Sequence, residues 1–188
     1  MKAVLKKDNN YTYADYCTWP EDERWELING VAYALSAPSE AHQSVLVELA
    51  RQISTQIRGL SCKVFVAPFS VRLNADEADD TVVEPDILVV CDKSKLDSGK
   101  GVVGAPDLIV EILSPSTARR DRDDKFKLYQ ISGVKEYWVV DTDLKLLTVN
   151  ILHEAGYLSR SYNDNDTAVP IEILPDCAIN LADVFDGI

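Results

Sequence analysis

The 188-residue sequence predicts an α/β fold with a mixed β-sheet flanked by helices and an N-terminal helix and hairpin. Residues 107–113 form an apolar run that is long enough for a strand and too short for a helix. Residues 114–117, Ser-Pro-Ser-Thr, then break the strand and offer caps for a helix over 118–131, with Gly133 as its stop. Residues 133–141 return as a strand. Such a crossover places its two strands in parallel with the helix packed on the sheet.

The N-terminal third predicts a short helix, a hairpin and a long helix. Thr12 is positioned to cap a helix through Tyr16, and residues 24–35 are typical of a hairpin with an Asn-Gly turn. A longer helix is expected over 41–58, ended by Gly59. We expect one domain over 1–188, with 1–36 as an arm for packing or dimer contact, 37–188 as the core, and a loose start before Tyr11.

The remaining segments predict further strands. Residues 63–73 and 82–90 are expected to be strands, the first with an edge position or bulge at Pro68. The acidic run 74–80 lacks the glycine and glutamate spacing of an EF-hand, so we interpret it as a solvated loop. Residues 93–104 are expected to be a loop, 146–152 and 157–162 a hairpin, and 171–174 with 181–185 the closing segments.

Two predicted strands carry a carboxylate inside an apolar pattern. Side chains alternate along a strand, so Glu111 shares a face with Ile109 and Leu113, and Asp86 shares one with Leu88 and Val90. An ionised carboxylate in such a place is costly unless it is paired or binds a metal. Both acids are therefore candidates for a site.

The helix that follows Glu111 carries a lysine on its apolar face. At about 100° per residue, the mean direction of the stripe falls almost on Lys125, while Lys127 points away. Asp121 and Tyr129 lie one turn before and after Lys125. We therefore expect Lys125 to approach Glu111. The apolar stripe consists of Ala118, Phe126, Leu128, Tyr129 and Ile131.

These residues favour metal-dependent chemistry. Two convergent carboxylates, Asp86 and Glu111, are hard ligands suited to Mg²⁺ or Mn²⁺, and a metal held there activates water and neutralises charge on a phosphodiester. Lys125 would position or deprotonate that water, or stabilise the oxyanion. The alternative is a buried salt bridge without a catalytic role, a costly way to hold a core. His42 falls on the apolar face of helix 41–58, as an accessory site residue or as a satisfied core or capping histidine.

Charge and cysteine usage limit the function classes. A net charge of −12 argues against strong non-specific DNA binding. Basic residues nevertheless flank the central stretch, either as a solvated mixed-charge surface or as a phosphate-facing rim. The four cysteines form no CxxC pair and are expected to be free thiols, and no apolar run suits a membrane span or secretion signal, which predicts a cytoplasmic protein. The basic residues are Lys93, Lys95, Lys100, Arg119, Arg120, Arg122 and Lys127.

The motifs also resemble a known family. Pro85-Asp86, the run from Pro106 through Glu111 to Thr117, Asp121 with Lys125 and Tyr129, and residues 133–141 resemble the "putative restriction endonucleases" of the Uma type, within the PD-(D/E)XK nuclease superfamily. Residues 25–30 and Pro38 followed by His42 match as well, so the resemblance covers about residues 13–185.

The resemblance implies a restriction endonuclease-like core and Mg²⁺-dependent cleavage of DNA. Asp86 and Glu111 would be metal ligands and Lys125 the catalytic lysine. The superfamily's usual lysine, two positions after the acid, is Leu113 here, and a lysine on the following helix would replace it.

Three functions follow as hypotheses. The first is a DNA endonuclease acting as a homodimer, because cutting both strands favours two sites related by symmetry. The second is a nuclease-fold protein without catalysis that acts as a nucleic-acid or protein interaction module. The third, a sugar hydrolase that uses Asp86 and Glu111 as acid and base, ranks last because the tryptophans do not cluster near those carboxylates in sequence.

Overall fold

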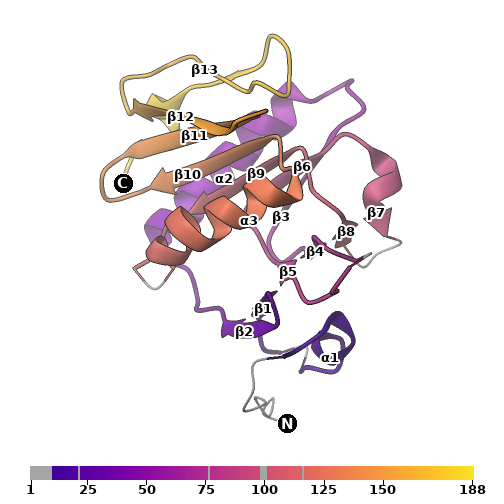
Figure 1. Cartoon of the computed structure of the whole chain (residues 1–188). Helices are drawn as coiled ribbons and strands as arrows, with labels where there is room; N and C mark the ends of the chain where they lie inside the picture. Colours follow the sequence, from indigo (N-terminus) through magenta and orange to yellow (C-terminus); the bar gives the residue numbers. More distant parts are fainter. Residues whose placement is uncertain (1–9, 21, 76, 98–100, 116) are drawn as a thin grey trace.

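In the computed structural model, the strands of the described residues form two six-stranded sheets and one two-stranded sheet (Figure 1). The structure describes residues 10–20, 22–75, 77–97, 101–115 and 117–188. One six-stranded sheet, called the core sheet below, has the order β12-β11-β10-β9-β6-β3, and the other, called the second sheet, has the order β2-β1-β5-β4-β8-β7. The expected mixed α/β architecture is confirmed.

The core sheet contains the predicted crossover. β9 and β10 pair in parallel, with Glu111 opposite Val139, while the other strand pairs of this sheet are antiparallel. A π-helical turn, Arg120–Asp124, and helix α3, Lys125–Ser132, connect them, and Gly133 ends α3 with a φ of 82°. The strands are β3 (Lys63–Val66), β6 (Ile87–Val90), β9 (Leu108–Ile112), β10 (Glu136–Asp141), β11 (Leu146–His153) and β12 (Gly156–Asn163).

The second sheet begins with the predicted hairpin. β1 and β2 are joined by Asn29 and Gly30, both with positive φ, as a tight hairpin turn requires. The strands are β1 (Trp25–Ile28), β2 (Val31–Ala34), β4 (Val71–Arg72), β5 (Val82–Val83), β7 (Leu96–Asp97) and β8 (Gly101–Val103). The remaining elements are α1 (Tyr13–Tyr16), α2 (Glu40–Gln56), a 3₁₀ turn (Lys93–Lys95), β13 (Val169–Pro170), β14 (Ala178–Ile179) and α4 (Leu181–Val184).

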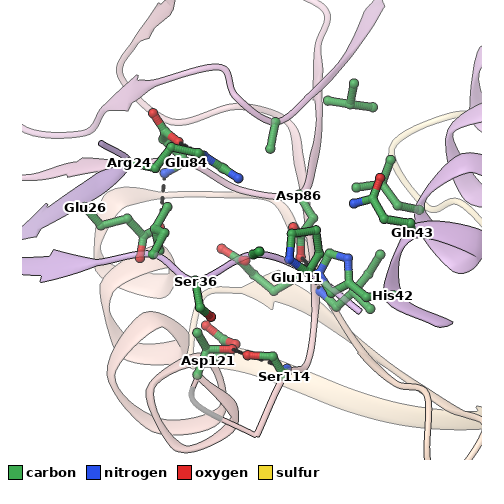
Figure 2. A pocket seen from close by; sticks show the side chains of 18 of the residues that line it. Arg24, Glu26, Ser36, His42, Gln43, Glu84, Asp86, Glu111, Ser114 and Asp121 are labelled. Carbon is green, nitrogen blue, oxygen red and sulfur yellow. Dashed lines mark hydrogen bonds and ion pairs between the residues drawn. The ribbon is translucent and has the colours of Figure 1, made fainter. Parts of the chain in front are cut away.

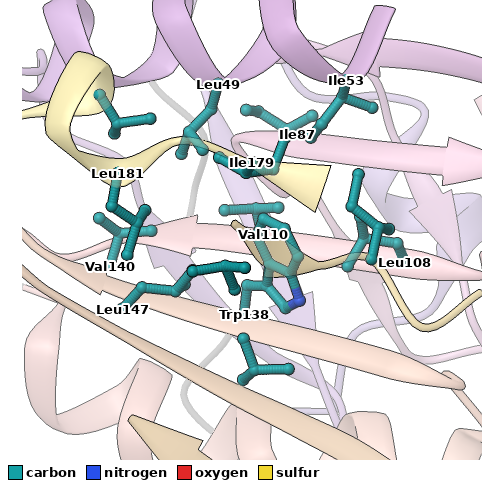
Figure 3. Close-up of a cluster of buried hydrophobic side chains, with 14 of the residues drawn as sticks. Leu49, Ile53, Ile87, Leu108, Val110, Trp138, Val140, Leu147, Ile179 and Leu181 are labelled. Carbon is teal, nitrogen blue, oxygen red and sulfur yellow. The ribbon is translucent and has the colours of Figure 1, made fainter. Parts of the chain in front are cut away.

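Both faces of the core sheet are covered by other elements, and β9 has buried side chains on each face. Leu108 and Val110 pack with α2, as Figure 3 shows for Leu49 and Ile53 on that side. Ile109 belongs to the opposite cluster, with Tyr129 of α3 and residues of the second sheet. Glu111 therefore lies on the face covered by α3.

Two predicted strands are each interrupted. Residues 63–73 divide into β3 and β4, and residues 82–90 divide into β5 and β6, with the two halves in different sheets. Pro68 and Pro85 lie at the breaks, and neither can donate a backbone hydrogen bond to a neighbouring strand. The second break places Asp86 in a turn at the start of β6. The expected loop 93–104 also contains two short strands.

The apolar stripe predicted for the helix was wrong at one position. Ile131 is 84% exposed, whereas Lys125 and Tyr129 are buried and Lys127 is exposed. Ile131 lies about 200° from Tyr129 around a helix, so it cannot share the buried face.

The expectation of free thiols was wrong for two of the four cysteines. Cys62 and Cys91 form a disulfide, while Cys17 and Cys177 are free. The two bonded residues are 29 positions apart in sequence. They lie beside each other because Lys63 pairs with Val90 across β3 and β6.

None of the helices in the described part of the chain has the length and apolar character that crossing a bilayer requires. Two other expectations, the loose start before Tyr11 and the role of Lys100, fall largely or wholly outside the described residues.

Candidate functional site

Asp86, just before β6, and Glu111 of β9 lie on the same side of the core sheet. Leu88 pairs with Ile109, and both belong to the cluster on the α3 side, which places Asp86 and Glu111 on this side as well. The backbone N–H of Ile112 donates to Asp86 Oδ2 at 2.8 Å. This bond holds the Asp86 carboxylate against the end of β9, beside Glu111 (Figure 2).

Lys125 is buried, with 3% of its surface exposed, and contacts Glu111 directly. Its Nζ donates to Glu111 Oε1 at 2.8 Å, and the Tyr129 hydroxyl donates to the same oxygen at 2.7 Å. Asp121 Oδ1 lies 3.5 Å from Lys125 Nζ. The helix therefore brings together the three residues that its sequence placed on one face.

A fourth carboxylate, which sequence reasoning missed, completes this cluster. Glu26 of β1 is fully buried, and its Oε1 accepts hydrogen bonds from Lys125 Nζ at 2.8 Å and from the Glu84 N–H at 3.0 Å. Its local pattern gave no signal of burial, because a glutamate that alternates with Trp25 and Leu27 is typical of a half-exposed strand. The available signal was the resemblance of residues 25–30 to the family motif. The N-terminal arm therefore contributes to the site, in addition to any packing or dimer role.

His42 reaches the site from the first turn of α2. Its backbone N–H donates to Ser39 Oγ, which fixes the start of the helix. Its Nε2 lies 3.2 Å from Asp86 Oδ2, so this ring nitrogen donates to the carboxylate. His42 Nδ1 is buried and makes no hydrogen bond.

The cluster holds more negative than positive charge. Burial raises the pKa of Glu111 well above its ordinary value, and the carboxylates of Asp121, Asp86 and Glu26 raise it further against the opposing effect of Lys125. Burial also raises the pKa of Asp121. Burial alone would lower the pKa of Lys125, but Glu111, Glu26 and Asp121 outweigh it, so the pKa is well above its ordinary value and Lys125 stays an ammonium.

The cluster borders a cavity of about 340 Å³, drawn in Figure 2. Asp86, Glu111, Lys125 and His42 line it together with segment 35–38 and residues of α2. Arg24 also lies at this cavity and forms a salt bridge to Glu84 at 3.0 Å. The cavity therefore lies beside the charged groups, of which Asp86 and His42 are the more exposed and Lys125 and Glu111 are nearly buried.

The donor set suits a hard divalent cation. Glu26 Oε2 and Asp121 Oδ1 are buried without a hydrogen bond, and carboxylate oxygens are the ligands that Mg²⁺ and Mn²⁺ prefer. Within the described ranges, no three acidic, histidine or cysteine side chains already stand together as a cation site. The Lys125 ammonium instead lies among the carboxylates.

Three of the flanking basic residues, Arg122, Lys95 and Arg120, are engaged in other contacts. Arg122 forms an ion pair with Asp141, and Lys95 donates to the Ala105 carbonyl at 2.7 Å. Arg120 lies 3.9 Å from the centre of the Tyr33 ring, with its Nη1 3.9 Å from Glu26 Oε2. Arg120 is thus the basic residue of this set that extends the charge cluster.

The family model described as "Uma2: Putative restriction endonuclease" matches residues 13–182. The chain belongs to the Uma2 family. The match spans both the arm that carries Glu26 and the crossover that carries Glu111 and Lys125, as the sequence motifs indicated.

Similar proteins were also found among curated and solved proteins. Two uncharacterized proteins of Synechocystis sp., slr1290 and sll1609, are 30% identical over 117 residues and 28% identical over 134 residues. These matches cover 61% and 69% of this Uma2 chain, and 60% and 74% of the relatives. The chain therefore spans less than two thirds of the length of the first relative.

A crystal structure described as a putative nuclease belonging to DUF820, from Anabaena variabilis, has the same fold. Its TM-score is 0.76 at 18% sequence identity, with 93% of this chain and 97% of that chain covered. At this identity the similarity shows the fold.

Proposed function

We propose that this Uma2 chain is a metal-dependent endonuclease that hydrolyses phosphodiester bonds of DNA. The observation that supports it most is the buried Lys125 ammonium on Glu111, with Asp86 on the same side of the sheet, at an open cavity. The family description and the fold of the Anabaena protein support the same class of reaction.

Asp86 and Glu111 would hold Mg²⁺ or Mn²⁺, with Asp121 and Glu26 supplying further negative charge. A bound cation would supply Lewis-acid activation of water and neutralise charge on the phosphate. Because its pKa is raised, Lys125 would act as a charged donor that stabilises the pentacovalent oxyanion rather than as the base that deprotonates water. His42 would orient Asp86 through the contact at 3.2 Å.

Cleavage of supercoiled plasmid in the presence of Mg²⁺ or Mn²⁺ tests this proposal. We expect Asp86→Asn and Lys125→Ala each to lower the cleavage rate by about 10²-fold or more, since each removes charge at the reacting phosphate. Asp124→Asn and Lys127→Ala, exposed neighbours on the same segment, serve as matched controls and should cut normally. Equal cleavage by all four variants would contradict the assignment.

A second candidate function is an interaction module with the nuclease fold and no catalysis. The net charge of −12 and the presence of Leu113 where the superfamily carries its lysine favour it. Isothermal titration calorimetry separates the two, because a module without catalysis has no need for a cation, whereas the endonuclease requires Mn²⁺ binding that Asp86→Asn weakens.

The endonuclease would work as a homodimer, because two symmetric sites can cut both DNA strands. Light scattering on purified protein checks the mass in solution. A monomer at concentrations where plasmid is linearised would contradict the paired-site arrangement.

A further inference from the structure

Glu26 connects three parts of the molecule through one carboxylate oxygen. It belongs to β1, accepts the Glu84 N–H in the segment that leads to Asp86, and accepts Lys125 Nζ from α3. The bond to Lys125 joins residues 99 positions apart. No solvent reaches the Glu26 side chain, so its charge is offset only by neighbouring protein groups.

We infer that Glu26 is the positioning residue for Lys125: it holds the ammonium at the site independently of Glu111. This inference rests on the proposed function, in which Glu111 contributes its charge to a cation. A divalent cation on Glu111 repels the ammonium that shares that carboxylate. A second acceptor is therefore needed if the lysine is to remain beside the reacting phosphate.

Glu26 meets this need better than the other carboxylates. Asp121 lies on the same helical segment as Lys125 and moves with it, and its Oδ1 is 3.5 Å from Nζ rather than 2.8 Å. Asp86 Oδ2 is already bonded to Ile112 N–H and His42. Glu26 stands on a separate sheet, and its bond to the Glu84 N–H fixes the accepting oxygen in place.

Two other roles for Glu26 make different predictions. If it were a metal ligand, its loss would weaken Mn²⁺ binding as strongly as the loss of Asp86 does. If it only stabilised the fold, its loss would lower stability and leave the chemistry of the folded protein unchanged. A positioning role affects the cleavage rate constant and the state of the Lys125 ammonium, and changes cation affinity far less than the loss of Asp86 does.

The test compares Glu26→Gln and Glu26→Asp with Glu136→Gln. Glu136 is a matched control because it is also a fully buried glutamate on a strand, bonded to Trp138 Nε1 and the Ile173 N–H and remote from Lys125 in its contacts. With saturating Mn²⁺, we expect Glu26→Gln to cut plasmid about 10²-fold more slowly in a single turnover, the usual cost of misplacing a catalytic group. Glu26→Asp, which keeps the charge, should recover part of the rate, and Glu136→Gln should retain it.

Calorimetry on the same proteins then decides the role. Glu26→Gln should weaken Mn²⁺ binding far less than Asp86→Asn does, because Glu26 would contribute only charge near the cation whereas Asp86 would be a ligand. A parallel loss of Mn²⁺ affinity in Glu26→Gln would overturn the inference in favour of a ligand role. An unchanged cleavage rate in folded Glu26→Gln would overturn it in favour of a purely structural role.

If the wild type neither cuts DNA nor binds Mn²⁺, the proposed function is rejected. The inference about Glu26 can then still be tested by nuclear magnetic resonance of ¹⁵N-lysine-labelled protein without metal. The Lys125 Nζ signal, assigned by its absence in Lys125→Met, should show slow proton exchange in Glu111→Gln, where Glu26 still holds the ammonium, and faster exchange in Glu26→Gln/Glu111→Gln. Slow exchange in both would overturn the positioning role. Should Glu26→Gln fold poorly, Glu26→Asp takes its place in both measurements, because its shorter side chain withdraws the acceptor from Lys125 Nζ; cleavage and exchange equal to those of the matching protein with Glu26 would then overturn the inference.

Discussion

Asp107 shows how a single buried acid depends on its partners. Burial acts to raise its pKa, but Lys135 Nζ at 2.7 Å and the Cys91 N–H at 2.7 Å outweigh that effect, so the pKa is lowered. An acid with a lowered pKa in the folded state contributes stability above its unfolded pKa, about 3.9, and loses that contribution as the pH falls through the folded pKa.

We therefore expect Asp107→Asn to be less stable than the wild type at pH 7 and equally stable at pH values below the folded pKa. The difference at pH 7 should be about 1 kcal/mol or less, because Lys135 is largely exposed and its charge is screened by water. Urea unfolding across the acid range measures it, with the exposed Asp124→Asn as control. A difference that grows toward low pH would contradict the sign.

For single residues, the sequence predicted the buried position correctly where the signal lay in neighbouring residues. Glu111 and Lys125 each interrupt an apolar pattern within their own element, and periodicity placed them inward. Asp86 was predicted inside strand 82–90 but lies just before β6, where the Ile112 N–H holds it on the same side. The prediction for Ile131 was wrong because the direction of the stripe was averaged over the fourteen positions of the helix, and the angle of Ile131 itself was not compared with that mean. Glu26 alternates with Trp25 and Leu27 as an exposed strand residue does, and its partner is 99 positions away, so no local pattern shows that it is buried against a distant charge.

Among the elements, β3 and β6 are joined by a covalent link as well as by their pairing. The Cys62–Cys91 disulfide closes a loop with a sequence separation of 29 residues. The strands also carry the core residues Ile87 and Val89, which pack beneath α2. The disulfide therefore restricts the unfolded chain at the β3–β6 strand pair, and Asp86 directly precedes β6.

Replacing both bonded cysteines by serine should lower the free energy of unfolding by about 2 to 4 kcal/mol, since a loop of this length loses its constraint in the unfolded state. Denaturant unfolding with and without reductant measures this loss. The exposed Cys17→Ser variant is the control and should unfold like the wild type. Equal stability of the reduced and oxidised wild type would contradict the expected contribution.

The helices and the two hairpins were predictable because residues adjacent in sequence form their caps and turns, such as Ser39, Gly133 and Asn29-Gly30. The interrupted strands were not, because Pro68 and Pro85 mark a break without showing that the chain then passes to another sheet. Disulfide pairing was likewise hidden, since it follows from the register of β3 on β6 rather than from cysteine spacing.

For the whole molecule, the net charge of −12 makes its stability sensitive to cations. We expect Mn²⁺ at about 100 times its Kd to raise the Tm by about 5 °C or more, because a ligand that binds the folded state alone adds about 2.7 kcal/mol at that concentration. Scanning calorimetry of the wild type, Asp86→Asn and Asp124→Asn measures the shift. Equal shifts in all three would show that Mn²⁺ binds the general surface rather than the carboxylate cluster.

The bond between Glu26 and Lys125 also constrains the order of events during synthesis. Glu26 emerges from the ribosome 99 residues before the ammonium that neutralises it, and the intervening chain includes α2, the other strands of the second sheet, and β3, β6 and β9 of the core sheet. Until α3 has emerged, the hairpin cannot bury this carboxylate without leaving a charge uncompensated. The nascent protein should consequently keep its hairpin undocked until at least 125 of its 188 residues have been made, so that the carboxylate cluster assembles late.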